Sequence, residues 1–189
     1  MNFAKGKCDR TLSQLVVVDV QHQLCEAMPA DRLEQVLNHT TLLVRAAGLL
    51  EIPLLLTEQY PQGLGPTHAR LSAVLPTATR PLIKTTFSCA ALPAFLETVS
   101  QHPDRRQLIL VGMETHVCVL QTALDLFALD FEVFVVEDAV SSRAHANRVN
   151  ALRRLEQAGV KITSAESLVF EWLSDAQHPQ FKTLLACLR

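Results

Sequence analysis

The stretch Leu108–Phe127, LILVGMETHVCVLQTALDLF, decides the fold. Its first residues form a branched apolar run, which is typical of a strand buried on both faces of a parallel sheet. Gly112 permits a sharp turn, and Thr115 is a suitable cap for the helix that the following apolar spacing predicts. Cys118 falls in the first turn of that helix, where backbone N–H groups and the helix dipole favour a thiolate. Cys118 is therefore a candidate nucleophile, and the alternative is a buried structural cysteine.

Strands and helices are predicted to alternate along the rest of the chain. The expected strands are Leu15–Val20, Ile52–Thr57, Pro81–Thr85, Gln107–Met113, Phe131–Glu137 and Lys161–Thr163. Besides the Cys118 helix, helices are expected from Asp31 to Leu50, over Ala90–Ser100, up to Gly159, and over Glu166–Leu173 and Pro179–Cys187, with loops at Gln21–Glu26 and Glu58–Ala69. This alternation predicts a single α/β domain over residues 1–189. Its architecture is three-layered and doubly wound, with a mostly parallel six-stranded sheet and helices on both faces.

Two polar residues near strand ends are candidates to assist Cys118. In a doubly wound sheet, ligands bind beyond the carboxyl ends of the strands where the chain reverses direction. With the strand order 3-2-1-4-5-6, the first and fourth strands are neighbours there, so Asp19 would meet Cys118. Asp19 is a candidate general base, and Lys84 a candidate buried cation that holds it. The alternatives are an Asp that bonds loop amides and a lysine whose stem lies on an edge strand.

Composition narrows the class of protein. A chain of 189 residues with 49% hydrophobic composition can form one domain with a sizeable core. The net charge of −2 and the lack of a basic block argue against nucleic-acid binding. Neither an N-terminal apolar signal nor an apolar run of about 20 residues occurs, so no membrane partner is expected. The five cysteines lack CxxC spacing, which is typical of a reduced, cytoplasmic chain.

No metal or cofactor is predicted. The seven histidines show no HxH or HxxxH spacing, and no Cys/His cluster has zinc-finger spacing. GxGxxG and P-loop motifs are also absent, which disfavours a nucleotide cofactor. The expected partner is a small-molecule substrate.

Several motifs resemble the isochorismatase-like cysteine hydrolases. The motifs are DVQ at 19–21, KTTFS at 84–88 and GMETHVC at 112–118, while TEQYPQGLGPT at 57–67, DAVSSR at 138–143 and HPQFK at 178–182 resemble the branch called isochorismatase domain-containing proteins. The resemblance covers about Leu12 to Leu185 and implies the strand order given above. It also implies a catalytic triad of Asp19, Lys84 and Cys118. The further implications are a cis peptide between Met113 and Glu114 and an oxyanion hole formed by the amides of Glu114 and Cys118.

The chain departs from this family's pattern at informative positions. Nicotinamidases of the family carry an Asp-x-His metal motif after the second strand, where this chain has Thr57-Glu58-Gln59, so neither the metal nor nicotinamide is supported. Leu24 stands where many relatives have Phe, which reshapes the pocket. True isochorismatases cleave a vinyl ether and can lack the cysteine, so Cys118 favours acyl chemistry.

The leading hypothesis is a metal-independent cysteine hydrolase that cleaves a small amide or related carbonyl compound through a thioester. Its expected pocket residues are Leu24, Tyr60, Phe87 and His116. One alternative is a vinyl-ether hydrolase with Asp19 as the acid, and another is a non-catalytic binding or scaffold protein on the same fold. By analogy with the family, a homo-oligomer (dimer or tetramer) is expected.

Overall fold

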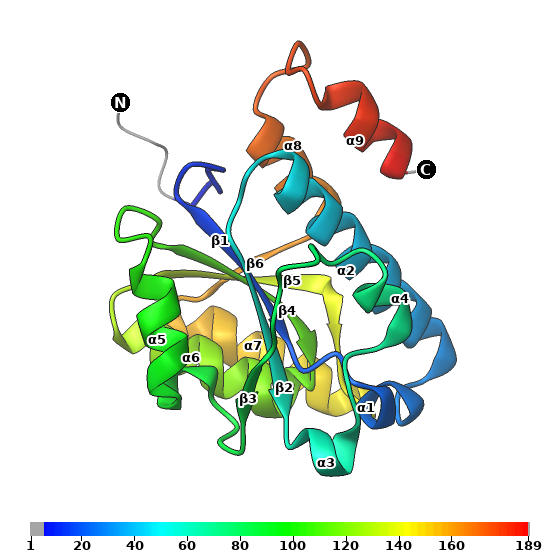
Figure 1. The fold of residues 1–189 in the computed structure, drawn as a ribbon. Coiled ribbons are helices and arrows are strands. Elements are labelled where there is room, and N and C mark those ends of the chain that lie inside the picture. Colours follow the sequence, from blue (N-terminus) through cyan, green and yellow to red (C-terminus); the bar gives the residue numbers. More distant parts are fainter. Residues whose placement is uncertain (1–5, 189) are drawn as a thin grey trace.

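Six strands form the central sheet of the molecule (Figure 1). The computed structural model describes residues 6–188, so the expected domain ends at residues 1 and 189 lie outside the described residues. The strands are β1 (Ser13–Val18), β2 (Leu54–Gln59), β3 (Leu82–Lys84), β4 (Gln107–Met113), β5 (Glu132–Ser141) and β6 (Lys161–Thr163). Their order is β3-β2-β1-β4-β5-β6, which confirms the predicted sheet, and all pairings between these strands are parallel.

Helices cover both faces of the sheet (Figure 1). One face packs against α2 (Ala30–Leu49), α4 (Ala69–Ser72), α8 (Ala165–Leu173) and α9 (Phe181–Cys187), and the other against α5 (Pro93–Ser100), α6 (Leu120–Ala128) and α7 (His145–Ala158). Shorter elements are α1 (His22–Glu26), α3 (Pro61–Leu64), a 3₁₀ turn η1 (Cys89–Ala91) and a π-helical turn η2 (Thr115–Val119). Across residues 6–188, none of the helices combines the length and apolarity that crossing a membrane requires.

Strand β1 shows why a continuous apolar run predicts a central strand. All six of its residues are buried. Successive side chains of a strand point to opposite faces. Leu15 and Val17 accordingly join the core cluster under α2 and α8, whereas Val16 and Val18 join the cluster under α5, α6 and α7. Asp19, the polar residue that follows β1, therefore lies at the carboxyl end of a central strand of the sheet.

Several sequence-based boundaries were wrong, and the expected loop Glu58–Ala69 contains the end of β2 and helix α3. The expected loop Gln21–Glu26 contains helix α1, because Cys25 is buried in the core beside Met113, with the two sulfur atoms 4.0 Å apart. Strand β5 does not end at Glu137 but continues to Ser141. A register shift opposite Leu110 and Gly112 lets β5 resume its pairing with β4 after an irregular segment, and such shifts leave no periodic signal in the sequence.

An ion pair between His39 and Asp138 joins helix α2 to strand β5. His39 Nδ1 lies 3.1 Å from Asp138 Oδ2 and 3.0 Å from the Asp138 carbonyl oxygen. The backbone N–H of Ala165, at the start of α8, donates to Asp138 Oδ1 at 2.9 Å. The hydrogen bond to Asp138 outweighs burial and raises the pKa of His39. Burial alone would raise the pKa of Asp138, but hydrogen bonds from His39 and Ala165 lower it.

This pair predicts a pH-dependent contribution to stability. The raised His39 pKa stabilises the fold fully below about pH 6.5, and the gain is lost as pH rises through the folded-state pKa. The lowered Asp138 pKa stabilises the fold above about pH 3.9, and the gain is lost as pH falls through its folded-state pKa. The urea midpoint of His39→Gln should therefore fall furthest below wild type between these limits. His102→Gln, at an exposed histidine, is the control, and a pH-independent difference for His39→Gln would contradict the prediction.

Candidate active site

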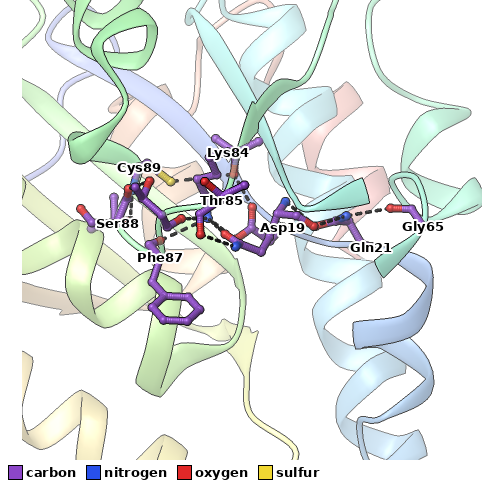
Figure 2. A network of polar contacts seen from close by, with 12 residues as sticks. Asp19, Gln21, Gly65, Lys84, Thr85, Phe87, Ser88 and Cys89 are labelled. Atoms are coloured by element: carbon purple, nitrogen blue, oxygen red, sulfur yellow. Dashed lines mark hydrogen bonds and ion pairs between the residues drawn. The ribbon is translucent and has the colours of Figure 1, made fainter. Parts of the chain in front are cut away.

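The carboxylate of Asp19 and the ammonium of Lys84 meet at the carboxyl edge of the sheet (Figure 2). Asp19 directly follows β1, and Lys84 is the last residue of β3, on the far side of β2. Lys84 Nζ donates to Asp19 Oδ2 at 2.7 Å, and both side chains are fully buried. A buried ion pair is retained only when further hydrogen bonds satisfy its remaining polar atoms.

Those further bonds come from strand β2 and from the loop after β3. Thr57 Oγ1 donates to Asp19 Oδ1 at 2.7 Å, so each carboxylate oxygen has its own donor. Lys84 Nζ also donates to Gln59 Oε1 at 2.8 Å and lies within 3.3 Å of the carbonyl oxygens of Thr86 and Phe87. Burial alone would lower the pKa of Lys84, but the charge and hydrogen bond of Asp19, together with smaller contributions from Cys89 and Cys118, outweigh it and the pKa is raised. Lys84 is therefore a permanent cation.

Thr57 and Gln59 belong to this network although neither was expected there. They lie two residues apart on β2 and so point to the same face, whereas Glu58 points away and accepts from Thr67 N and Oγ1 at 2.7 and 2.6 Å. Gln59 is itself fixed, because its Nε2 donates to the Thr85 carbonyl and its N–H donates to Gln21 Oε1. The strand period was the signal in the sequence that could have placed Thr57 and Gln59 beside Asp19.

Cys118 lies in η2, directly after β4, and only 5% of its surface is exposed. Burial raises the pKa of its thiol, the charge of Asp19 raises it further, and Lys84 acts in the opposite direction. Loss of hydration thus opposes the thiolate that the start of a helix favours. A neutral thiol beside a carboxylate requires that carboxylate, or another base, before it can act as a nucleophile.

The turn between β4 and η2 differs from a simple capped helix. The peptide bond between Met113 and Glu114 is cis. Glu114 occupies the cap position, and the Thr115 hydroxyl, which was expected to cap, is buried without a hydrogen-bond partner in the described part of the chain. The Glu114 carboxylate instead accepts from the backbone N–H of Arg143 at 3.1 Å, which ties the turn to the segment after β5. The peptide units of Glu114 and Cys118 thus belong to one fixed turn.

The four expected pocket residues come from four different segments. Tyr60 follows β2 and donates its N–H to the Lys84 carbonyl at 2.9 Å, while the Phe87 ring points away from the ion pair (Figure 2). His116 lies in η2, with Nδ1 2.9 Å from Ser142 Oγ. Leu24, on α1, packs against the core on the α2 side of the sheet. Within residues 6–188, no three His, Cys, Asp or Glu side chains converge as metal ligands would.

Comparison with known proteins identifies relatives of this chain. A family model described as the isochorismatase domain matches residues 13–167. Isochorismatase domain-containing protein 2 of Bos taurus is 40% identical over 172 residues, which cover 91% of this chain and 80% of the relative.

Solved structures share the fold. A structure described as the MAR1 ribonuclease of Caenorhabditis elegans superposes with a TM-score of 0.89 at 36% identity, covering 96% of this chain and 92% of that chain. YcaC of Escherichia coli, described as an octameric hydrolase of unknown specificity, gives a TM-score of 0.84 at 24% identity, covering 99% of this chain and 98% of that chain. At that identity the likeness to YcaC shows a common fold.

Proposed function

The chain belongs to the isochorismatase family, and from that premise we propose that it is a metal-independent cysteine hydrolase that cleaves a small amide or related carbonyl compound. The observation that supports the proposal is the buried Asp19–Lys84 pair at the end of β1, next to strand β4, which the turn carrying the buried Cys118 follows. A nucleophile, a base and a group that orients the base are the parts that nucleophilic catalysis needs. The side chains of Thr57 and Gln59 are engaged with Asp19 and Lys84, so β2 offers this pair no metal ligands of its own.

The reaction follows from the charges of these three groups. Asp19 takes the proton of the Cys118 thiol, and the thiolate attacks the substrate carbonyl carbon. The oxyanion that forms is held by the amides of Glu114 and Cys118. When the tetrahedral intermediate collapses, the carbon–nitrogen bond breaks and Asp19 returns the proton to the leaving amine. A water molecule, deprotonated by Asp19, then hydrolyses the thioester and restores the thiol.

The charge of Lys84 would allow the neutral thiol of Cys118 to act as the nucleophile. Transfer of the proton from Cys118 to Asp19 turns a carboxylate and a thiol into a carboxylic acid and a thiolate, so the net charge of the site is unchanged. Because Lys84 stays cationic, it stabilises the negative charge on whichever partner carries it. Leu24, Tyr60, Phe87 and His116 are proposed to line the outer part of the substrate pocket, since Leu24 packs against the core and the Phe87 ring points away from the ion pair.

The alternative of vinyl-ether cleavage assigns Asp19 the role of an acid. Both of its oxygens already accept hydrogen bonds, from Thr57 and Lys84, and an oxygen that accepts suits a base better than an acid. The C. elegans relative is described as a ribonuclease, so RNA is a further substrate class to test. If no substrate is turned over, the result would favour a non-catalytic binding or scaffold role.

A substrate screen tests the proposal. Small amides and carbamoyl compounds, isochorismate and RNA would be offered to wild type, Cys118→Ala and Asp19→Ala. We expect turnover of an amide or carbamoyl compound that falls by roughly 10³-fold or more in both variants. Turnover of isochorismate that is lost in Asp19→Ala and kept in Cys118→Ala would select vinyl-ether cleavage. Undiminished amide turnover in Cys118→Ala would overturn the cysteine mechanism.

We also propose that the chain forms a homo-oligomer, a dimer or a tetramer, through the β3 edge of the sheet. Tyr60, Ile83 and Phe87 around this edge strand are large apolar side chains, each more than half exposed. Clustered exposed apolar side chains are typical of an interface. Analytical ultracentrifugation is expected to give a mass of two or more chains, and a monomer at all concentrations would contradict the proposal.

A further inference from the structure

We propose that Thr57 is a positioning residue that fixes the Asp19 carboxylate in the orientation needed for proton transfer from Cys118. The inference rests on the proposed role of Asp19 as the base. Thr57 is fully buried on β2, opposite Val18 of β1, so its side chain reaches Asp19 from the neighbouring strand. Its hydroxyl donates to Asp19 Oδ1 at 2.7 Å, while Lys84 donates to Oδ2 at the same distance.

Two donors from two strands fix the carboxylate more firmly than the lysine alone. An ammonium group can follow a carboxylate that rotates about its Cβ–Cγ bond, because its three hydrogens are equivalent. A second donor on the other oxygen prevents that rotation. A threonine hydroxyl has one hydrogen, and here it is committed to Asp19, so toward Cys89 the Thr57 oxygen acts only as an acceptor, with the sulfur at 3.8 Å.

The titratable groups that face Asp19 are Lys84 from β3, Cys89 from η1 and Cys118 from η2. Burial raises the pKa of Cys89 to about 11, so this thiol is neutral at ordinary pH and adds no charge. Loss of the Thr57 hydroxyl would leave Asp19 Oδ1 without this donor, so the carboxylate could rotate away from the orientation that proton transfer from Cys118 needs.

Alkylation of Cys118 reads out this effect without a known substrate. The rate of modification by iodoacetamide would be followed on the Cys118 peptide by mass spectrometry from pH 5 to 10, in wild type, Thr57→Val and Thr57→Ser. We expect Thr57→Val, which keeps the side-chain shape, to slow modification about tenfold across this pH range. Thr57→Ser, which keeps the hydroxyl, should restore most of the rate.

Control variants separate this inference from a structural role and from the proposed function. Cys89→Ser changes the other neighbour of Thr57 but leaves the bond to Asp19, so its profile should match that of wild type. If Thr57→Val unfolds, Thr57→Ala provides the same comparison. A folded Thr57→Val or Thr57→Ala with the wild-type profile would overturn the inference while Cys118 remains reactive. An inert Cys118 in wild type, with the exposed Cys187 modified as an internal standard, would instead overturn the proposed function and the inference with it.

Discussion

Replacing Lys84 with methionine is expected to lower the free energy of unfolding by about 3–5 kcal/mol and to abolish the reactivity of Cys118. The change removes the ammonium but leaves the Asp19 carboxylate fully buried, with Thr57 as its remaining side-chain donor among the described residues. The Gln59 side-chain oxygen loses its donor as well. Removing one partner of a buried pair leaves an uncompensated charge, which costs far more than the pair contributes.

Urea unfolding of four proteins would measure this cost: wild type, Lys84→Met, Asp19→Asn and the double variant. Asparagine suits position 19, because the backbone there has a positive φ of 50°. We expect the double variant to be more stable than Lys84→Met, since it buries no charge, and yet to show no Cys118 alkylation. Lys182→Met, at an exposed lysine of α9, is the control and should unfold like wild type. A Lys84→Met protein that also unfolds like wild type would show that water solvates the Asp19 carboxylate, and it would contradict the prediction.

The Asp19–Lys84 pair is expected to matter more for the reactivity of Cys118 than for the stability of the fold. A buried ion pair is weak support for a fold, since apolar residues of similar volume often serve as well. Here the pair joins the carboxyl ends of β1 and β3 across β2, on the edge where ligands bind in doubly wound sheets. Retention of a costly charge at that edge is consistent with a catalytic role rather than a structural one.

The fold could be predicted because its signals are local. The β1 run is buried on both faces, and the stretch after Leu108 forms a strand, a turn and a helix as expected. The strand order needed the family resemblance, because periodicity does not specify which strands are neighbours. The continuation of β5 to Ser141 depends on a register shift against β4, and pairing of that kind has no signature within β5 itself.

The sequence singles out the residues of the candidate site, but it does not specify their burial or their hydrogen-bond partners. Asp19, Lys84 and Cys118 stand out because each is a polar or reactive residue at the end of an apolar strand. The position of Cys118 after a strand is visible in the sequence, whereas its burial, which raises the pKa of the thiol, depends on how distant segments pack around it. Thr57 and Gln59 were considered only as missing metal ligands, although their spacing on one strand face already pointed them at the same neighbours.

Gly112→Ala is expected to destabilise the protein by about 3 kcal/mol or more, because this glycine meets two separate requirements. Its backbone has a φ of 119°, a conformation that residues with a Cβ rarely adopt. A Cβ atom at this position would also lie 2.0 Å from the carbonyl oxygen of Val18, the residue paired with Gly112 in β1. Backbone atoms cannot yield as a flexible side chain would, so β1 and β4 would have to separate.

Separation of β1 from β4 should slow the reaction of Cys118 as well as destabilise the fold. Val18 directly precedes Asp19, and Gly112 precedes the turn that carries Cys118, so the contact between them sets how closely base and nucleophile approach. A folded fraction of Gly112→Ala should therefore alkylate Cys118 more slowly than wild type. Gly48→Ala is the matched control. An added Cβ meets nothing within 4 Å there, and the exchange at an exposed position of α2 should stabilise by about 0.5–1 kcal/mol. Urea midpoints that move in the same direction for both variants would refute this account of Gly112, since only Gly112 opposes the β1 backbone.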